Sequence, residues 1–354
     1  MLLHGIIPPV TTPFTPEGDV YFKKLEYNVD RFCRGPVAGI AVLGSTGEAI
    51  LLSDQERRDV LRAAREAASP EKVLVAGTGI ESAIETLRLT EYAAGLGYDA
   101  ALIRTPHFYK SHMNRPQNML AFYRTVADRS PLPVVIYNFP QNTGYDMPTE
   151  LVAELAEHPN IIGIKESSGS VEKCKAIVDA TRHLKATATV TEVQAAVTGR
   201  MLQQATAATA GDGGMIPVGA LGGRPSSAAV EVVGGLKTRQ KEVGFQVLVG
   251  AAHRLLPALE VGAVGAILQF ACAAPTACFE VFTAHKERAM EIARDKQQRI
   301  SEAAENVSGG MGVPGTKYAM DLNGYYGGPV RLPLLPLTGD QKAEVERLMM
   351  NIRS

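Results

Sequence analysis

The chain has 354 residues, of which 45% are hydrophobic and 21% charged, a composition typical of a globular protein with a large buried core. Its formal net charge is −1 at pH 7 and its sequence pI is about 6.7, so the composition gives no electrostatic reason to expect a nucleic-acid or membrane partner. We therefore expect a small-molecule partner.

Short apolar runs bounded by glycine and proline alternate along the chain with segments of helical periodicity. The predicted strands lie near residues 5–10, 39–43, 72–77, 99–104, 133–138, 161–165, 245–249 and 263–268. About eight such strand and helix units predict a (β/α)8 TIM barrel. The alternative is a doubly wound open sheet, which would need a glycine-rich phosphate turn after the first strand, where this chain has Pro8-Pro9-Val10-Thr11-Thr12.

Two of the predicted helices carry clear start or stop signals. One helix starts at Ser53, which has capping-box spacing to Glu56. Another starts near Ser82 and is ended by Gly95 and Gly97, since glycine is the residue that most readily leaves a helix.

Residues 185–241 break the strand and helix rhythm. They are rich in Ala, Thr, Gly and Val, and in a barrel they would form an insertion between the sixth helix and the seventh strand, on the face opposite the strand-to-helix loops. We expect flexible or poorly ordered structure there, with an oligomer contact or a translated non-coding segment as alternatives. The barrel is predicted to span residues 1–273 and a C-terminal helical region residues 274–354, with helices over about 275–306, 314–322 and 338–352.

The cysteines, the histidines and the N-terminal segment together predict a cytoplasmic protein without a metal site. The four cysteines show no CxxC spacing, which predicts free thiols, with a Cys272–Cys278 disulfide as the less favoured alternative. The seven histidines show no spacing that would gather metal ligands. The first ten residues do not resemble a secretion signal, and no segment is long and apolar enough to span a membrane.

A lysine stands in the sixth apolar run, Ile161-Ile162-Gly163-Ile164-Lys165-Glu166. The preceding run contains Tyr137, and if the two runs are parallel neighbours, a phenol and an amine emerge at the same end of one sheet. Burial disfavours the charged form of lysine, and the neutral amine forms Schiff bases with ketones. The alternative is a solvated Lys–Glu pair at the end of a strand. The pattern favours carbonyl chemistry.

Three motifs follow predicted strands at barrel spacing: Gly44-Ser45-Thr46-Gly47-Glu48, Tyr137-Asn138-Phe139-Pro140 through Thr143-Gly144, and Gly163-Ile164-Lys165-Glu166. Together they resemble the dihydrodipicolinate synthase and N-acetylneuraminate lyase family of Schiff-base aldolases, over nearly the whole chain except 185–241. Within that family, the chain looks most similar to 4-hydroxy-2-oxoglutarate aldolases, through Asn142-Thr143-Gly144, His158-Pro159-Asn160-Ile161 and Gly324-Tyr325-Tyr326-Gly327-Gly328-Pro329.

The resemblance implies catalytic roles by position. Lys165 would form the imine with the ketone of a 2-oxo acid such as pyruvate, so no cofactor and no metal are expected, and Tyr137 would shuttle protons. Ser45 and Thr46, with Gly47 in the same turn, would hold the substrate carboxylate through a closely approaching backbone. The alternative for this motif is a plain turn before a helix.

Further positions concern the surroundings of the substrate. The resemblance places the backbone of Ile267 beside bound pyruvate. It makes Ser167 a contact to a hydroxylated or oxo substrate, with a helix cap as the alternative. Asn142 stands where dihydrodipicolinate synthases place an arginine that binds the carboxylate of the aldehyde, and Gly250 begins the segment that replaces their acidic pair.

The second proton-relay tyrosine of the family aligns with Phe108 in this chain. Tyr109, one residue later, is our catalytic candidate for that role, and His107 is a further candidate.

The expected activity is that of a class I aldolase of the lyase type. It would form or cleave a 4-hydroxy-2-oxo acid, of the 4-hydroxy-2-oxoglutarate or 2-keto-3-deoxy sugar acid type, to or from pyruvate and an aldehyde. The alternatives are a 4-hydroxy-tetrahydrodipicolinate synthase that uses aspartate semialdehyde, a dehydratase that works through the same imine, and a barrel that binds a 2-oxo acid without turnover. The resemblance also implies a homodimer or homotetramer.

Overall fold

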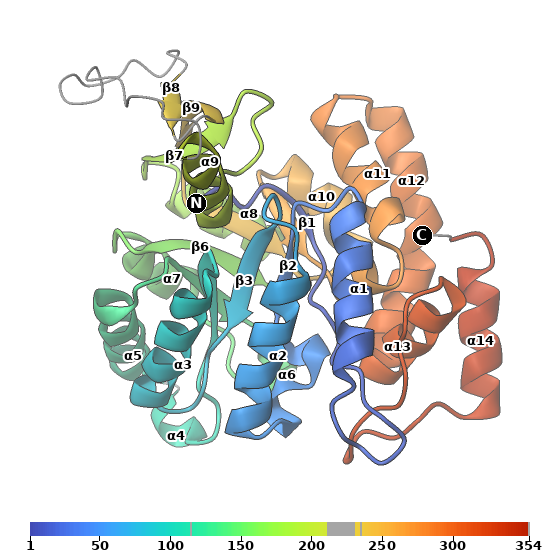
Figure 1. Ribbon diagram of the computed structural model, residues 1–354. Helices are drawn as coiled ribbons and strands as arrows, with labels where there is room; N and C mark the ends of the chain where they lie inside the picture. The colour runs from blue at the N-terminus through green and yellow to red at the C-terminus, as the bar shows by residue number, and fades with distance from the viewer. Residues whose placement is uncertain (114, 211–230, 234–235, 353–354) are drawn as a thin grey trace.

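The computed structural model describes residues 1–113, 115–210, 231–233 and 236–352. Eight parallel strands form one sheet in the order β1-β11-β10-β6-β5-β4-β3-β2. A parallel bridge between Pro9 and Ala41 joins β1 to β2 and brings the two edges of the sheet together (Figure 1). The predicted TIM barrel is therefore confirmed, and the open doubly wound sheet is wrong. The strands are β1 Gly5–Ile7, β2 Gly39–Val42, β3 Val73–Gly77, β4 Ala100–Arg104, β5 Val134–Asn138, β6 Ile161–Glu166, β10 Gln246–Val249 and β11 Gly265–Ile267.

Alternate residues of the strands fill the inside of the barrel. In β5, for example, Val135 and Tyr137 belong to the interior cluster, whereas Val134 and Ile136 belong to the larger cluster beneath the helices. This follows from the two-residue period of a strand, which sends successive side chains to opposite faces. Tyr137 is thus the last interior residue of β5, at its carboxyl end.

Helices cover the outside of the barrel. The helix α2 begins at Ser53, whose side chain and that of Glu56 form the predicted capping box. The helix α3 runs through Gly95 and ends at Gly97, which has the left-handed conformation (φ 88°) that glycine permits, so only the second predicted stop ends it. The α-helices before the insertion are α1 Phe22–Arg34, α2 Asp54–Ala67, α3 Ala83–Leu96, α4 Lys110–Met113, α5 Pro116–Arg129, α6 Pro140–Thr143, α7 Thr149–Ala156 and α8 Val171–Ala180.

The insertion folds at the end of the barrel opposite α4 and α6 (Figure 1). Three antiparallel strands, β7 (Ala186–Thr191), β8 (Glu231–Val233) and β9 (Leu236–Val243), form its sheet, and α9 is Gly199–Ala210. The insertion stands between α8 and β10, where the sequence pattern predicts it, and β7, β8, β9 and α9 have regular structure. The prediction of poor order also covers residues 211–230 and 234–235, which lie outside the described part.

Buried contacts explain why the insertion has regular structure. Ala188, Val190 and Val243 pack with Leu2 in a small cluster of their own. Arg200 at the start of α9 pairs with Asp99 at 3.5 Å, and each side chain is only 3% exposed. The guanidinium also donates to the carbonyl oxygens of two residues before β3, Ser69 and Lys72.

The chain after β10 is mostly helical. It forms α10 Leu255–Glu260, α11 Pro275–Lys286, α12 Met290–Ala303, a π-helical turn over Ala304–Gly310, α13 Gly312–Leu322 and α14 Gly339–Met349. Within the described residues, no helix is long and apolar enough to cross a membrane. All four cysteines are free thiols, as predicted, including Cys272 and Cys278.

Candidate active site

Three side chains stand in one row at the carboxyl ends of neighbouring strands. Tyr137 of β5 pairs in register with Lys165 of β6, and Arg104 of β4 pairs in register with Tyr137. Residues in register on parallel strands point to the same face, so all three point toward the barrel interior. Lys165 and Tyr137 are each 4% exposed, and Lys165 Nζ lies 4.1 Å from the centre of the Tyr137 ring. The structure thus brings the amine and the phenol together.

Glu166 is separated from Lys165 by the alternation of the strand. Its carboxylate accepts hydrogen bonds from Asn138 Nδ2 at 2.9 Å and from the Ser168 backbone at 2.6 Å, and it lies 3.8 Å from Lys173 Nζ. The alternative of a solvated Lys–Glu pair is therefore wrong. In the described part of the chain, Lys165 forms no ion pair.

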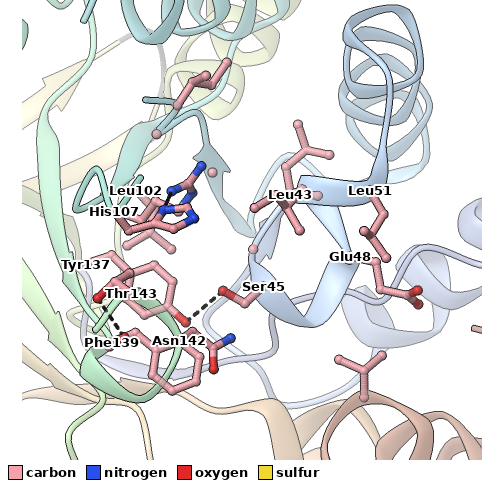
Figure 2. Close-up of a pocket in the computed structure, with 18 of the residues that line it drawn as sticks. Leu43, Ser45, Glu48, Leu51, Leu102, His107, Tyr137, Phe139, Asn142 and Thr143 are labelled. Carbon is pink, nitrogen blue, oxygen red and sulfur yellow. Dashed lines mark hydrogen bonds between the residues drawn. The ribbon is translucent and has the colours of Figure 1, made fainter. Parts of the chain in front are cut away.

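The turn after β2 reaches Tyr137 from the other side of the barrel. Ser45 begins a short 3₁₀ segment, Ser45–Gly47, and its Oγ lies 3.3 Å from the Tyr137 hydroxyl (Figure 2). Thr46, the next residue, lines the same cavity as Lys165. Ser45 therefore contacts Tyr137, and Thr46 shares a cavity with the buried amine.

Glu48 anchors this turn, a role that the motif alone did not reveal. Its backbone is left-handed (φ 53°), and its buried carboxylate lies 2.6 Å from Lys317 Nζ and accepts from the Arg331 backbone at 2.9 Å. Lys317 is 1% exposed and donates to the carbonyl oxygens of Thr12 and Pro329. Burial lowers the pKa of Lys317, but this second buried lysine is paired with a carboxylate and does not line the cavity.

The cavity at the mouth of the barrel has two lobes of about 510 Å³ each. Both lobes are lined by Tyr137, Phe139, Gln141 and Asn142. The lysine lobe is further lined by Thr46, Lys165, Ser167, Ser168 and Gly250. The arginine lobe is further lined by Ser45, Glu48, Arg57, Gly79, Arg104 and His107.

Ser167 and Gly250 face each other in the lysine lobe. A Cβ on Gly250 would lie 1.9 Å from Ser167 Oγ, so only glycine leaves room for this side chain. Ser167 Oγ is buried and has no hydrogen-bond partner within the described residues. The residue lines the lysine lobe, and it does not cap the following helix, which is capped by Ser170.

Three predicted site residues are not brought into the cavity. Tyr109 is 65% exposed and packs edge-to-face on Phe108, which is 73% exposed, and neither lines either lobe. Ile267 is fully buried inside the barrel without lining the cavity. Gly47 supports the turn instead, since a Cβ there would lie 2.9 Å from the Val10 carbonyl oxygen. Of the three candidates for the second relay position, only His107 reaches the cavity in a single chain.

Glu81 organises the loop that carries His107. Its carboxylate accepts from the backbone N–H groups of His107 at 2.9 Å and Phe108 at 3.0 Å, and from Arg104 NH1 at 2.9 Å. Although burial opposes this, these donors lower the pKa of Glu81. Burial and the neighbouring Arg104 charge lower the pKa of His107, so the imidazole is neutral at pH 7. Among the described residues, no group of three or more His, Cys, Asp or Glu side chains could hold a metal ion.

A TIM barrel with a buried lysine and a tyrosine at its mouth defines a protein with a class I aldolase fold. The sequence model of the Dihydrodipicolinate synthetase family matches residues 2–187 and 228–352. The chain belongs to this family, whose members are class I aldolases. The unmatched stretch, 188–227, lies inside the predicted insertion.

Relatives and solved structures agree with this family. A 4-hydroxy-tetrahydrodipicolinate synthase of Methanothrix thermoacetophila is 26% identical over 350 residues, which cover 98% of this chain and 96% of the relative. One of Xanthomonas campestris pv. campestris is 40% identical over 178 residues, which cover 50% of this chain and 58% of the relative. The predicted closeness to 4-hydroxy-2-oxoglutarate aldolases is not confirmed by these names.

Two crystal structures match nearly the whole chain. A putative dihydrodipicolinate synthetase from Pseudomonas aeruginosa has a TM-score of 0.77 at 22% identity and covers 99% of this chain and 100% of its own. YagE from E. coli K12, a member of the dihydrodipicolinic acid synthase family in complex with pyruvate, has a TM-score of 0.75 at 25% identity and covers 99% of both chains.

Proposed function

We propose that the chain is a pyruvate-dependent aldolase in which Lys165 forms an imine with the 2-oxo group of pyruvate. The observation that carries the proposal is a buried amine 4.1 Å from the centre of the Tyr137 ring, in a cavity, without an ion pair among the described residues. The pyruvate complex of YagE, a relative in fold and family, supports the choice of 2-oxo acid.

The neighbouring hydroxyls supply the proton transfers of this chemistry. Lys165 Nζ attacks the ketone carbon, and Tyr137, 3.3 Å from Ser45, passes a proton to the oxygen that leaves as water. The protonated imine then withdraws electrons, so a proton passes from the methyl carbon of pyruvate to the Tyr137 oxygen and an enamine forms. That carbon attacks the aldehyde carbon, Tyr137 returns the proton to the aldehyde oxygen, and water hydrolyses the imine to release the product and the free Lys165 amine. Cleavage is the same sequence in reverse.

In this proposal the turn after β2 holds the carboxylate of pyruvate. Ser45 and Thr46 lie beside Tyr137 and Lys165, and backbone N–H groups in such a turn are good donors to an anion. Ser167, whose hydroxyl has no protein partner among the described residues, contacts the oxygen of the second substrate.

The names of the relatives make aspartate semialdehyde the first candidate for the aldehyde, which would make the chain a 4-hydroxy-tetrahydrodipicolinate synthase. A second candidate is the cleavage of a 4-hydroxy-2-oxo acid such as 4-hydroxy-2-oxoglutarate. It is favoured by Asn142, a neutral side chain that lines both lobes where an arginine clamp is expected for aspartate semialdehyde. A dehydratase working through the same imine would be recognised by its product.

Two coupled assays test the proposal. One follows the consumption of pyruvate with aspartate semialdehyde, and the other follows the release of pyruvate from 4-hydroxy-2-oxo acids with lactate dehydrogenase. We expect turnover in at least one assay and none above background in Lys165→Met. Imine formation without turnover in either assay would instead support a barrel that only binds a 2-oxo acid, and equal turnover by Lys165→Met would refute the proposal.

The proposed chemistry also bears on whether the enzyme needs a cofactor or metal. The imine forms from the Lys165 amine and the ketone, with protons moved by protein hydroxyls, so we propose that no cofactor or metal is required. A chelator should therefore leave the rate unchanged. A homodimer or homotetramer in the cytoplasm stays a prediction. Light scattering of the purified protein measures the oligomeric state.

A further inference from the structure

Arg104 is a cation inside the cavity for which the imine chemistry gives no role. It ends β4 in the same row as Tyr137 and Lys165, so it points into the barrel mouth. The loop after β3 packs directly over it, because a Cβ on Gly79 would lie 2.4 Å from the Arg104 backbone nitrogen and 3.1 Å from its Cγ. Its position is therefore fixed by the fold.

Only one side of the Arg104 guanidinium is used by the protein. NH1 donates to Glu81 Oε1 at 2.9 Å and lies 2.6 Å from His107 Nδ1, which is itself 2.7 Å from Glu81 Oε1. Nε and NH2, which form the opposite edge of the fork, make no hydrogen bond among the described residues. The side chain is 22% exposed and lines the arginine lobe. Two parallel N–H groups are the arrangement that binds a carboxylate with both oxygens.

The charges around this edge favour an anion. The carboxylate of Glu48 is neutralised by Lys317 at 2.6 Å, and that of Glu81 offsets one guanidinium. Arg57 lines the same lobe and uses its Nε for the Ala49 carbonyl oxygen, while the nearby Asp54 is exposed outside the lobe at the start of α2. The charged side chains that line or brace the arginine lobe therefore sum to one positive charge.

We propose that the open edge of Arg104 binds a second carboxylate, carried by the aldehyde half of the substrate, so that the enzyme selects aldehydes with an acid group. This inference rests on the proposed imine at Lys165 and adds the class of its second substrate. The Cα atoms of Lys165 and Arg104 are two strand spacings apart, about 10 Å, and both side chains are long. Tyr137 stands between them in the row, and it lines both lobes. A short 2-oxo diacid would therefore lie across the two lobes, with its ketone at the amine and its far carboxylate at the guanidinium.

The competing explanation is that Arg104 only braces the loop after β4 through Glu81 and His107. A brace affects all substrates alike, whereas a carboxylate ligand affects only those that carry the carboxylate. The test is therefore the discrimination between aldehydes with and without an acid group, at saturating pyruvate: aspartate semialdehyde and glyoxylate against propionaldehyde and acetaldehyde.

We expect Arg104→Met to raise the KM and lower kcat/KM for the two acidic aldehydes about 10- to 100-fold, the effect of losing a charge-assisted hydrogen-bonded pair. Turnover of the two neutral aldehydes should change less than about threefold. Arg104→Lys keeps the charge without the fork and should fall between wild type and Arg104→Met. The control is Arg88→Met on α3, an exposed arginine paired with Glu85, which should match wild type for all four aldehydes.

Trapping the pyruvate imine with borohydride in each variant separates the two proposals. If the imine forms but wild type shows no preference for acidic aldehydes, or Arg104→Met weakens all four alike, the carboxylate site is refuted and the imine mechanism stands. If wild type forms no imine, both fall. Should Arg104→Met fail to fold by circular dichroism, Arg104→Lys carries the same comparison.

Discussion

Tyr137 contacts both groups that an imine mechanism would use. Its ring faces the Lys165 amine at 4.1 Å, and its hydroxyl lies 3.3 Å from Ser45 Oγ. The side chain is 4% exposed and stacks on Phe139, with the ring centres 5.7 Å apart. The ring is thus held by packing, and Tyr137 faces both lobes of the cavity from a fixed position.

We expect Tyr137→Phe to lower kcat about 10²- to 10⁴-fold, because the proton transfer loses its donor. The KM for pyruvate should change little, since the turn at Ser45 and Thr46 remains. Steady-state kinetics measure both values. Tyr145→Phe is the matched control: that hydroxyl is buried without a hydrogen bond among the described residues, and its removal should leave kcat unchanged. An unaltered kcat in Tyr137→Phe would contradict the proton-transfer role.

Single residues were predictable where a strand carries a polar residue at its end. Lys165 and Tyr137 stand at the ends of apolar runs, and their proximity was predictable from the sequence. Arg104 was missed, although it follows Leu102 by one strand period, because only the register of β4 against β5 shows that it shares a row with Tyr137. Tyr109 was expected in the site, but a single chain leaves its side chain 65% exposed.

The turn after β2 depends on the C-terminal helices. Glu48 in the turn and Lys317 on α13 form a buried pair whose side chains are 0% and 1% exposed. Each is also hydrogen-bonded to the backbone, Glu48 by Arg331 and Lys317 to Thr12 and Pro329. Removing one partner would leave a buried charge without its counterion, so the segment after α12 is part of the support for Ser45 and Thr46.

Lys317→Met should therefore lower the free energy of unfolding by about 3–5 kcal/mol. Urea denaturation followed by circular dichroism measures it. Arg34→Ala removes one partner of an exposed pair, in which the two side chains are 78% and 47% exposed, and should change stability by at most about 1 kcal/mol. Similar small effects for both variants would show that the buried pair does not hold the turn.

Strands and helices were predictable where the apolar pattern agrees with the glycine and proline residues that bound it. All eight barrel strands overlap their predicted runs, since short apolar runs between glycines and prolines are characteristic of a parallel barrel. The structure of the insertion was not predictable from its weak apolar pattern. Its sheet packs on Leu2, and Arg200 donates hydrogen bonds to backbone carbonyl oxygens more than 100 residues away in the sequence. Long-range partners of this kind leave no local signal.

The end of the barrel away from the active site joins three distant parts of the chain. A cavity of about 520 Å³ there is lined by His4 from the N-terminal segment, Lys241 from the insertion strand β9 and Lys286 from α11. Burial, followed by the charges of Lys241 and Lys286, lowers the pKa of His4 to about 4. The imidazole is therefore neutral in the folded protein at physiological pH.

This histidine should make stability fall in mild acid. In the unfolded chain its pKa is about 6.5, so between pH 6.5 and 4 the unfolded chain binds more protons than the folded one. The contribution of neutral His4 to the free energy of unfolding is therefore fully present above pH 6.5. It is lost as the pH falls toward 4, and the total loss is up to about 3 kcal/mol. Urea denaturation at several pH values should show that the free energy of unfolding changes less steeply with pH in His4→Gln than in wild type. Identical slopes would contradict the assignment.

The measurement that tests the imine most directly is reductive trapping. The protein is incubated with pyruvate and sodium borohydride, digested, and its peptides are weighed by mass spectrometry. We predict one adduct of reduced pyruvate on the peptide that contains Lys165, absent in Lys165→Met and present in Lys317→Met. Folded protein without an adduct on Lys165, or with the adduct on Lys317, would contradict the mechanism.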